Sequence, residues 1–518
     1  MLEAMQNANE NKDNNPFSIP GFAADSAADR PELKCLDLNC LCSEFGGTSN
    51  GSINDCTLPN GQKLTKAIRK EIRMLTFQER IDLFKAIRQM KDQGDYDYIA
   101  AIHRLAFESG AAHSGPTFCI WHREYIKRFE ILLRKQNPSI VLPYWDSTMD
   151  RLLPYPPDSI LFTDDFLGTT NSQGYVVTGP FSPWETLEGK PNISRNVGKD
   201  GRCMSEWDVQ WNLDQTRVED ILPYSVPGKN CPYDVKWSWL EYPHGNVHAF
   251  VGGDMFNFYP NSAANDFVFF LLHSFVDSIF ESWRQIHQNR TQRVDEYPAD
   301  LADCEPTSHF RNATMTQFSP LQNWEGLKNE YTDNLYEYAP RPTCTYTTEC
   351  ESEWLFCDRS HGSPHCAAKA RLGGNCTGFT NGEDVCMNST CVNGICIVIE
   401  TSTQQQTTLQ STTVKPTTKE AKSTIKTTKQ NNFNPNKTII STIPNVINII
   451  NSKTTSKRLI STTKTSSNST TIKTLISTLN KSIDIIKTKQ TTLQPRKTTD
   501  SKTIKLKGDC EIIRGDNI

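Results

Sequence analysis

Long apolar runs are missing from this sequence. No stretch of roughly 18 apolar residues occurs among its 518 residues, and a membrane-spanning helix needs about that many. The polar start, "MLEAMQNANENKDNNPFS", lacks the apolar core of a signal peptide. CxxC pairs and the HExxH motif are absent as well, which disfavours structural zinc and excludes that class of zinc protease. The sequence therefore predicts a protein without a membrane span.

Acidic residues are scarce only at the end of the chain. From residue 401 onward, 20 Lys and Arg stand against 6 Asp and Glu, so this part carries about +14 and the remainder about −18, for a net charge of −4. An acidic body argues against nucleic acid as the main partner. The end of the chain is a Thr/Ser/Lys-rich tract, which predicts a disordered, stalk-like tail over residues 399–518.

Cysteine is abundant and unevenly placed. Of the 17 cysteines, eight lie between residues 344 and 396 and four between residues 35 and 56. Such clusters predict disulfide frameworks and an oxidising compartment, and nine N-x-S/T sequons agree with secretion. We therefore expect an extracellular glycoprotein whose N-terminus is truncated or misassigned here. The odd total leaves at least one thiol free or bonded between chains; Cys119 is the candidate for a buried free thiol, and Cys203 is expected to pair with Cys231.

Composition divides the chain into four parts. Residues 1–34 are polar and unpatterned, residues 344–398 hold the larger cysteine cluster, residues 399–518 form the tail, and residues 35–343 lie between them. This central part begins with a short disulfide-stapled lead-in. Its Pro- and Gly-rich residues 150–235 predict long loops that shape a site. We expect a disordered N-terminus, a helical domain, a small disulfide module and a disordered tail.

Apolar residues recur at helical spacing in four stretches of the central part. The first begins with a capping box, Thr76-x-x-Glu79, and ends at a glycine. The last is apolar on all sides in its first half, as a helix inside a bundle must be. The four stretches are residues 76–94, 95–107, 119–135 and 265–287. The predicted fold class is mainly α, with a four-helix bundle at its core.

Six of the ten histidines fall into two triplets on or beside these helices. In the first triplet, His103 and His122 lie on successive predicted helices, and His113 lies in the turn-rich "GAAHSGP" between them. The surroundings of His113 and His122 are apolar and aromatic, where a buried imidazole needs a polar partner. A single histidine of this kind is more often a satisfied core residue, but a metal ion would serve all three at once.

The second triplet has the spacing of a metal site on a helix. His244 and His248 are four residues apart, which places both on one helical face, and His273 comes from the next apolar helix. Asp277, one turn beyond His273, could orient that imidazole through its second ring nitrogen. An isolated H-x3-H pair is a weak signal. Two triplets that each end on an apolar helix predict a two-metal centre in the bundle core.

The donor set and two long motifs point to one family. Six imidazoles without a carboxylate ligand favour copper or zinc over magnesium, calcium or manganese, and copper stands highest in the order of affinities. "HSGPTFCIWHREYIKRFE" resembles the first-copper signature of the tyrosinase family of type 3 copper proteins, and "DFVFFLLHSFVD" resembles the second. The resemblance covers roughly residues 60–300, and the cysteine-rich segments on either side resemble those of secreted invertebrate members.

The resemblance implies a role for each matching residue. The first copper ion would be bound by His103, His113 and His122, and the second by His244, His248 and His273. Glu241 matches the family carboxylate that orients an active-site water, although a helix N-terminus by itself also favours an acid there. Arg123 and Asp277 match residues that support the ligands. Gly245 departs from the family, because many phenol-hydroxylating members carry Asn at this position. The resemblance thus implies diphenol oxidation more strongly than monophenol hydroxylation.

The function implied by the resemblance is copper-dependent oxidation of phenols or o-diphenols to o-quinones, with O2 as co-substrate. Small phenols or tyrosyl side chains would be the substrates, pigment or cross-linked protein the outcome, and an extracellular matrix the setting. Two alternatives stay open. One is an oxygen carrier, in which the module of residues 344–398 would cover the copper site. The other is a non-catalytic matrix protein that keeps all six ligands.

Overall fold

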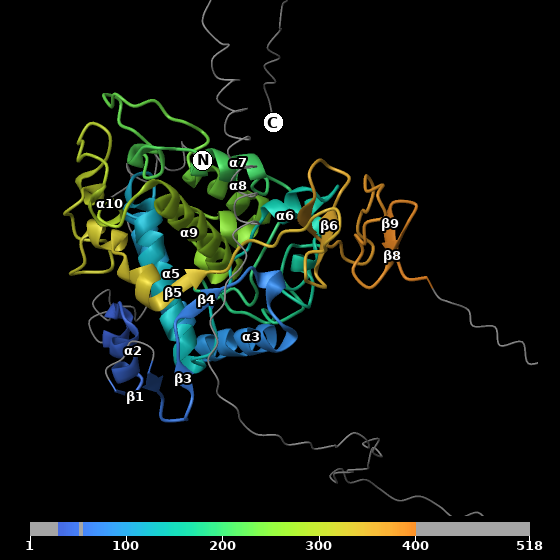
Figure 1. Ribbon diagram of the computed structural model, residues 1–518, viewed down its shortest axis with the longest axis horizontal. Coiled ribbons are helices and arrows are strands. Elements are labelled where there is room, and N and C mark those ends of the chain that lie inside the picture. The colour runs from blue at the N-terminus through green and yellow to red at the C-terminus, as the bar shows by residue number, and fades with distance from the viewer. Residues whose placement is uncertain (1–29, 51–54, 259, 400–518) are drawn as a thin grey trace, which may run out of the picture. The chain divides into compact units, whose positions relative to one another are not determined.

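Helices occupy the centre of the molecule, and strands form only short sheets in the part of the chain that is described (Figure 1). The computed structural model describes residues 30–50, 55–258 and 260–399. The predicted disorder of residues 1–29 and 400–518 lies outside these ranges. Pro31–Lys34 already forms a 3-10 helix with Leu33 fully buried, so regular structure begins before the boundary predicted at residue 35.

The elements follow one another along the chain in a helix-rich order. The α-helices are α2 (Leu38–Glu44), α3 (Phe77–Asp92), α4 (Asp95–Glu108), α5 (Thr117–Gln136), α6 (Thr148–Arg151), α7 (Glu206–Leu213), α8 (Glu241–Val251), α9 (Val268–His287) and α10 (Gln292–Asp295). The strands are β1 (Thr48–Ser49), β2 (Cys56–Thr57), β3 (Lys63–Leu64), β4 (Ala67–Arg69), β5 (Tyr336–Tyr338), β6 (Leu355–Asp358), β7 (His365–Ala368), β8 (Thr390–Val392) and β9 (Ile395–Ile397). Strands β1, β2 and β3 form an antiparallel sheet, β6–β7 and β8–β9 form antiparallel pairs, and β4–β5 is parallel.

The four predicted helical stretches are confirmed as α3, α4, α5 and α9. Both reciprocal hydrogen bonds of the predicted capping box are present at the start of α3, from the Glu79 N–H to the Thr76 hydroxyl (3.2 Å) and from the Thr76 N–H to the Glu79 carboxylate (2.8 Å). The predicted loop-rich region, residues 150–235, contains α7 and short 3-10 turns between long irregular segments. The fold is thus helical at its centre and irregular over much of its surroundings.

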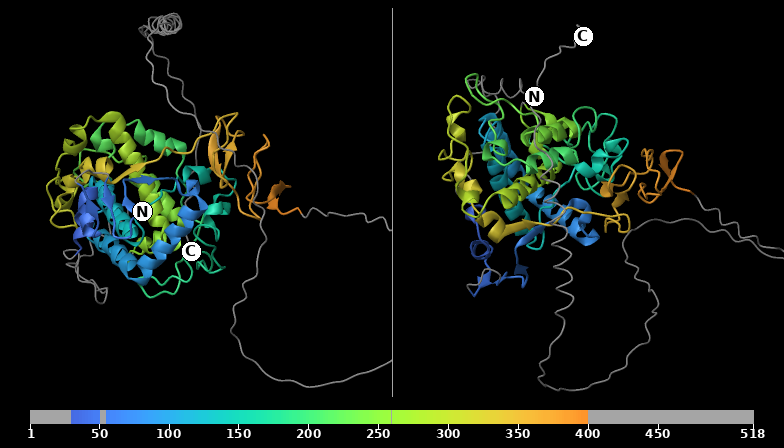
Figure 2. Two further views of the ribbon diagram at one scale, coloured as in Figure 1. Left: turned by 60° about the horizontal axis from the view of Figure 1, so that its bottom comes forward. Right: turned by 45° about the horizontal axis from the view of Figure 1, so that its top comes forward.

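Helices α5 and α9 form the central pair, and they lie side by side in the views of Figures 1 and 2. Apolar and aromatic side chains fill the space between them: Phe129 stacks on Phe270 with ring centroids 3.8 Å apart, and Tyr125 stacks on the same ring at 5.6 Å. Burying such large rings is the main source of stability in a core of this kind. Since His122 lies on α5 and His273 on α9, this packing brings one histidine of each triplet together.

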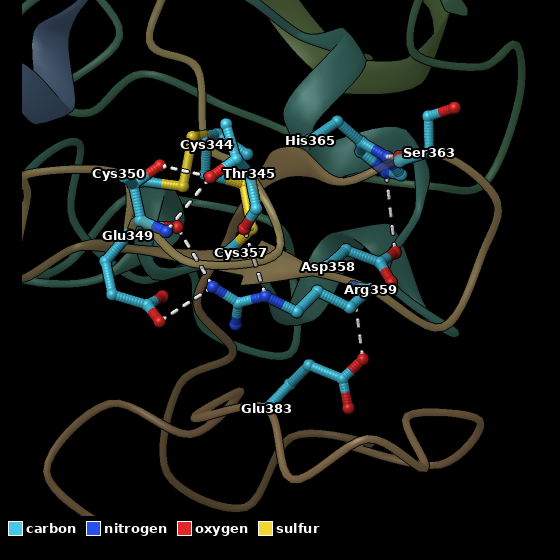
Figure 3. Close-up of a disulfide and its surroundings, with 12 residues drawn as sticks. Cys344, Thr345, Glu349, Cys350, Cys357, Asp358, Arg359, Ser363, His365 and Glu383 are labelled. Atoms are coloured by element: carbon cyan, nitrogen blue, oxygen red, sulfur yellow. Dashed lines mark hydrogen bonds and ion pairs between the residues drawn. A yellow bond between two sulfur atoms is a disulfide. The ribbon is translucent and has the colours of Figure 1, made fainter.

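The disulfide frameworks predicted from the two cysteine clusters are confirmed. The pairs are Cys35–Cys40, Cys42–Cys56, Cys344–Cys357, Cys350–Cys366, Cys376–Cys391 and Cys386–Cys396. Figure 3 shows the module around Cys344, Cys350 and Cys357. There the guanidinium of Arg359 donates to the Glu349 carboxylate (2.8 Å) and to the carbonyl of Thr345 (3.2 Å).

One predicted pairing is wrong. Cys231 bonds to Cys304, with Cα atoms 4.6 Å apart, and not to Cys203. A disulfide requires Cα atoms within about 7 Å, and that proximity depends on how the long loops fold back, which residue spacing does not reveal. Among the described residues, Cys203 is instead a buried free thiol, as is Cys119, which confirms the prediction for Cys119.

Residues 344–399 pack against the irregular segment that follows α6. The ring of Trp354 meets Phe166 edge-on (5.0 Å between centroids), and the Arg371 guanidinium donates to the Asp158 carboxylate (2.9 Å). All described residues belong to one compact unit. Among them, no helix combines the length and the apolarity that crossing a membrane requires.

Candidate metal centre

The first histidine triplet is assembled from two helices and the loop that joins them. His103 lies on α4, His122 on α5 and His113 in the connecting loop. All three are buried, and one ring nitrogen from each lies within 4.8 Å of the others. The Nδ1 atoms of His103 and His122 face Asn261 Oδ1 (3.1 Å) and the Phe118 carbonyl (2.8 Å), and their Nε2 atoms have no hydrogen-bond partner among the described residues.

The second triplet brings three Nε2 atoms face to face. His244 and His248 lie one turn apart on α8, and His273 lies on α9. The Nε2 atom of His273 is 3.2 Å from that of His244 and 3.4 Å from that of His248. Backbone carbonyls hold the other ring nitrogens on α8: Glu241 O lies 3.1 Å from His244 Nδ1, and Met255 O lies 2.7 Å from His248 Nδ1.

These nitrogens fit two metal ions. Burial lowers the pKa of all six imidazoles, and neighbouring histidines lower it further for five of them; the pKa of His248 falls to about 4. The rings are therefore neutral near pH 7. Carbonyl and amide oxygens only accept. The Nδ1 atoms of the four histidines that face such an oxygen therefore carry the hydrogen, and their Nε2 atoms present lone pairs; these are His103, His122, His244 and His248. Buried lone pairs without a donor are costly, and a cation shared by each triplet satisfies them.

The two triplets are neighbours. The rings of His122 and His273 stack with centroids 4.1 Å apart, so the two candidate ion positions lie beside each other. Neutral imidazole donors without a carboxylate suit copper. The histidine clusters thus fit a dinuclear copper site.

Two groups behind the candidate ligands were not predicted from the sequence. Asn261, in the irregular segment before α9, hydrogen-bonds His103 across 158 residues of sequence. The ring of Phe269 lies 4.1 Å from His273 and 4.5 Å from His103, measured between centroids. Neither residue stands out in the sequence, because Asn261 belongs to no periodic segment and Phe269 is one of several phenylalanines in an apolar run.

The predicted contact between Asp277 and His273 is wrong. Asp277 accepts hydrogen bonds from Arg123 Nε (2.7 Å) and from the hydroxyls of Tyr336 (2.8 Å) and Tyr338 (2.7 Å), while His273 Nδ1 has no hydrogen-bond partner among the described residues. The carboxylate turns away from the histidine because strand β5 supplies two phenols that satisfy it. Arg123 and Asp277 therefore join α5 to α9 beside the candidate ligands. Arg123 follows His122 directly, and Asp277 lies one turn after His273.

Glu241 lies at the start of α8 and is buried. Its carboxylate accepts the backbone N–H of Ser114 (2.7 Å) and the hydroxyl of Ser225. Burial raises the pKa of Glu241 to about 7, and the two hydrogen bonds limit the rise. The carboxylate thus ties α8 to the loop that carries His113.

A cavity opens beside the two triplets. Its lining includes histidines of both triplets, with an apolar and aromatic wall and two amides. The lining residues are His103, Phe107, His113, His244, Gly245, His248, Met255, Phe256, Asn257, Phe258, Asn261 and Ala263. A flat aromatic molecule with a polar edge suits such a wall, because rings pack on rings while the polar edge meets the donor nitrogens.

Comparison with known proteins agrees with this centre. Residues 93–286 match the model of the common central domain of tyrosinase. A tyrosinase-like protein of Caenorhabditis elegans is 47% identical over 365 residues, which are 70% of this chain and 52% of that protein. The tyrosinase of Streptomyces glaucescens is 30% identical over 241 residues, 42% of this chain and 83% of that enzyme. A solved polyphenol oxidase of Thermothelomyces thermophila aligns with 65% of this chain and 97% of its own at 17% identity, with a TM-score of 0.43.

The central-domain match and the Streptomyces and nematode relatives place the chain among proteins built around a pair of copper ions held by histidines. The chain belongs to the tyrosinase family. It spans about half of the length of its nematode relative.

Proposed function

We propose that this protein oxidises phenols, and o-diphenols above all, to o-quinones with O2 at a pair of copper ions. The observation that carries the proposal is the pair of adjacent, buried histidine triplets, four of whose histidines line an aromatic cavity. The first ion would be held by His103, His113 and His122, and the second by His244, His248 and His273. When bound, the two ions would supply the binding and reduction of O2.

The protein's own part is to hold these nitrogens and to orient the substrate. Helices α4, α5, α8 and α9 would act as a four-helix bundle that keeps the donors in place without reorganisation. The rings of Phe107 and Phe258, 5.8 Å apart between centroids, line the cavity and would orient a phenol by stacking. Buried apolar walls exclude water from the reacting atoms.

An open cavity supports the enzyme over the oxygen carrier. Within the described part of the chain, no residue of 344–399 lines the cavity. That module contacts the segment after α6, through Trp354 and Arg371, and does not cover the histidines that line the cavity.

Copper loading and turnover test the proposal. The full chain should bind two copper ions and oxidise catechol, read as quinone absorbance and O2 uptake. His273→Asn should lose the second ion and reduce turnover by at least about 100-fold, since one ligand is gone. His287→Asn on the same helix is the matched control and should change neither. O2 binding without catechol turnover would favour the oxygen carrier, and a chain that binds no copper would contradict the proposal.

We further propose that Glu241 holds a water beside the second ion and that Gly245 restricts the enzyme to diphenols. Each Glu241 oxygen already accepts one hydrogen bond and retains capacity for another. Gly245 follows His244 on α8 and lines the cavity, but it has no side chain with which to fix that water.

Substituting Gly245 tests the roles proposed for Glu241 and Gly245. Gly245→Asn should increase tyrosine hydroxylation at least about 10-fold relative to catechol oxidation, because an amide beside Glu241 would complete a water site. Gly245→Ala is the control for side-chain volume and should show no such gain. Adding Glu241→Gln to Gly245→Asn should remove the gain. Efficient tyrosine hydroxylation by the unmodified protein would refute the role given to Gly245.

We also propose an extracellular location. The support is the set of seven disulfides in the described residues, because such bonds persist in oxidising compartments. Quinones react with amines and thiols, so pigment or cross-linked matrix protein would be the product, and the Thr/Ser-rich tail would retain the enzyme in that matrix.

A further inference from the structure

His113 differs from the other five candidate ligands in how it is held. The other five lie on helices α4, α5, α8 and α9, whereas His113 lies in the loop between α4 and α5. Its ring makes no hydrogen bond to any described residue, and its Nδ1 atom is buried without a partner. The direction of this imidazole therefore depends on the backbone of its loop and on packing against rings such as Phe107, whose centroid lies 5.1 Å away.

That backbone is held by residues from far away in the sequence. Nε2 of His309 lies 2.8 Å from the carbonyl oxygen of Gly110, three residues before His113. On the other side of His113, the ring of His309 lies directly against Gly115, where a Cβ atom would collide with Nδ1. One imidazole thus contacts the loop on both sides of the candidate ligand. Glu241 adds a third contact, from the Ser114 N–H.

His309 is itself rigidly placed. Its side chain is fully buried, and burial lowers its pKa to about 4, so the ring is neutral. Since the Gly110 carbonyl only accepts, Nε2 must carry the hydrogen. The backbone oxygen of His309 accepts the hydroxyl of Tyr297 (2.5 Å), and the amide of Asn323 donates to the carbonyls of Ser308 (2.8 Å) and Phe310 (2.9 Å). These bonds hold the backbone at His309 and at both of its neighbours.

A disulfide links the two segments that contact the His113 loop. Cys231–Cys304 joins the segment before α8 to the segment that carries His309, and the Gly228 N–H donates to the Cys304 carbonyl (3.3 Å). On the α8 side, the Val226 N–H lies 3.4 Å from the Ser114 carbonyl. The His113 loop is therefore held between two segments that are covalently linked to each other.

We propose that His309 is the positioning residue for His113, and that its hydrogen bond to Gly110 together with its packing on Gly115 sets the affinity of the first copper position. This rests on the proposed copper centre. Groups that support a ligand from behind commonly change metal affinity by about 10- to 100-fold when removed.

Copper retention in the full chain tests the assignment. His309→Leu removes the donor and keeps an apolar side chain, whereas His309→Gln keeps an N–H near the position of Nε2. His287→Leu is the matched control, because Nε2 of His287 also bonds to a backbone carbonyl, that of Leu213 (2.6 Å), about 20 Å along α9 from His273 at 1.5 Å per residue. Bound copper is measured against increasing chelator, with thermal unfolding of the copper-free proteins alongside.

The expected result is a selective loss. His309→Leu should release one of two copper ions at a chelator concentration at least about 10-fold below that needed for the unmodified protein. The remaining isolated Cu(II) should give an electron paramagnetic resonance signal that the coupled pair does not. His309→Gln and His287→Leu should retain both ions as the unmodified protein does.

Other outcomes separate the possible failures. If His309→Leu retains both ions as well as the unmodified protein does, only the role given to His309 is overturned. If the unmodified protein binds no copper, the proposed centre and this inference are both overturned. If His309→Leu does not fold, Gly115→Ala gives the second measurement, because its methyl group displaces the same ring. Loss of one ion from that variant supports the inference, and unchanged retention overturns it.

Discussion

The guanidinium of Arg123 lies between two buried carboxylates. It donates to Asp277 and to Glu281, both at 2.7 Å, and Arg284 adds a bond to Glu281 at 2.6 Å. Burial alone would raise the pKa of Glu281, but the two cations outweigh it and lower the pKa to about 2. Removing one charged side chain from this buried cluster leaves its partners buried without an opposite charge.

At the scale of the residue, we predict an acid-sensitive contribution from Glu281. Its pKa in the folded state, about 2, lies below the ordinary value of 4.5. The carboxylate therefore stabilises the fold fully above about pH 5, and this contribution, on the order of 3 kcal/mol, is lost as the pH falls toward 2. The measurement is denaturant unfolding at a series of pH values. The deficit of Glu281→Gln, meaning its loss of unfolding free energy relative to the unmodified protein, should be largest above pH 5 and should shrink toward pH 2.

The control for this prediction is Glu330→Gln, at an exposed position, which should show no comparable deficit. A deficit of Glu281→Gln that stays constant between pH 2 and pH 7 would contradict the prediction. Because burial also lowers the pKa of His248 and of His309 to about 4, only the difference between variant and unmodified protein is informative.

At the scale of the element, the helices were predictable from the residues at their ends and from the helical spacing of their apolar residues. Gly94 has a left-handed backbone (φ 79°) and connects α3 directly to α4, a conformation that glycine adopts without strain. In α3, the helical spacing of apolar residues did not predict burial at the first position. Phe84 and Ile87 are buried, but Phe77 is 65% exposed. A period predicts the helix, while burial at each position depends on which other element reaches it.

For α3, we predict that the capping box contributes measurably to stability. Thr76→Ala removes the acceptor for the Glu79 N–H and should lower the free energy of unfolding by about 1 kcal/mol. Thr76→Ser retains the hydroxyl and should cost less than half as much. Because α3 carries no candidate ligand, copper content should stay unchanged in both variants. A loss of copper from Thr76→Ala would show that α3 influences the centre, contrary to this expectation.

At the scale of the molecule, the disulfide module and the helical part share packing surfaces. Trp354 belongs to the main core and lies under the guanidinium of Arg80 (4.4 Å to the ring centroid). The Ile160 N–H donates to the Lys369 carbonyl (2.9 Å), which links the segment after α6 to the module. Shared core residues couple the unfolding of the two parts.

The division into domains is therefore tested best by truncation. A chain ending at residue 399 should unfold in a single calorimetric transition and should retain the catechol turnover of the full chain, because the shared core and the cavity are both present. Retention by extracellular matrix should be lost with the tail. Two separate transitions would show that residues 344–399 fold independently, and lost turnover would give the tail a role at the centre.

The sequence by itself determined the local features of this protein. Helical period and capping residues predicted α3, α4, α5 and α9, and the spacing of the histidines predicted both triplets, because these patterns arise within one element or between adjacent ones. The six disulfides inside the two cysteine clusters likewise join residues at most 16 apart.

Only the tertiary structure decided the contacts that support the centre. Cys231 pairs with Cys304 across 73 residues, Asp277 turns to Tyr336 and Tyr338, and His309 reaches Gly110 across 199 residues. No local pattern encodes such partners, because they meet only when long irregular segments fold back onto the helices. The two histidine triplets could therefore be found from the sequence, whereas the groups that hold them in place required the fold.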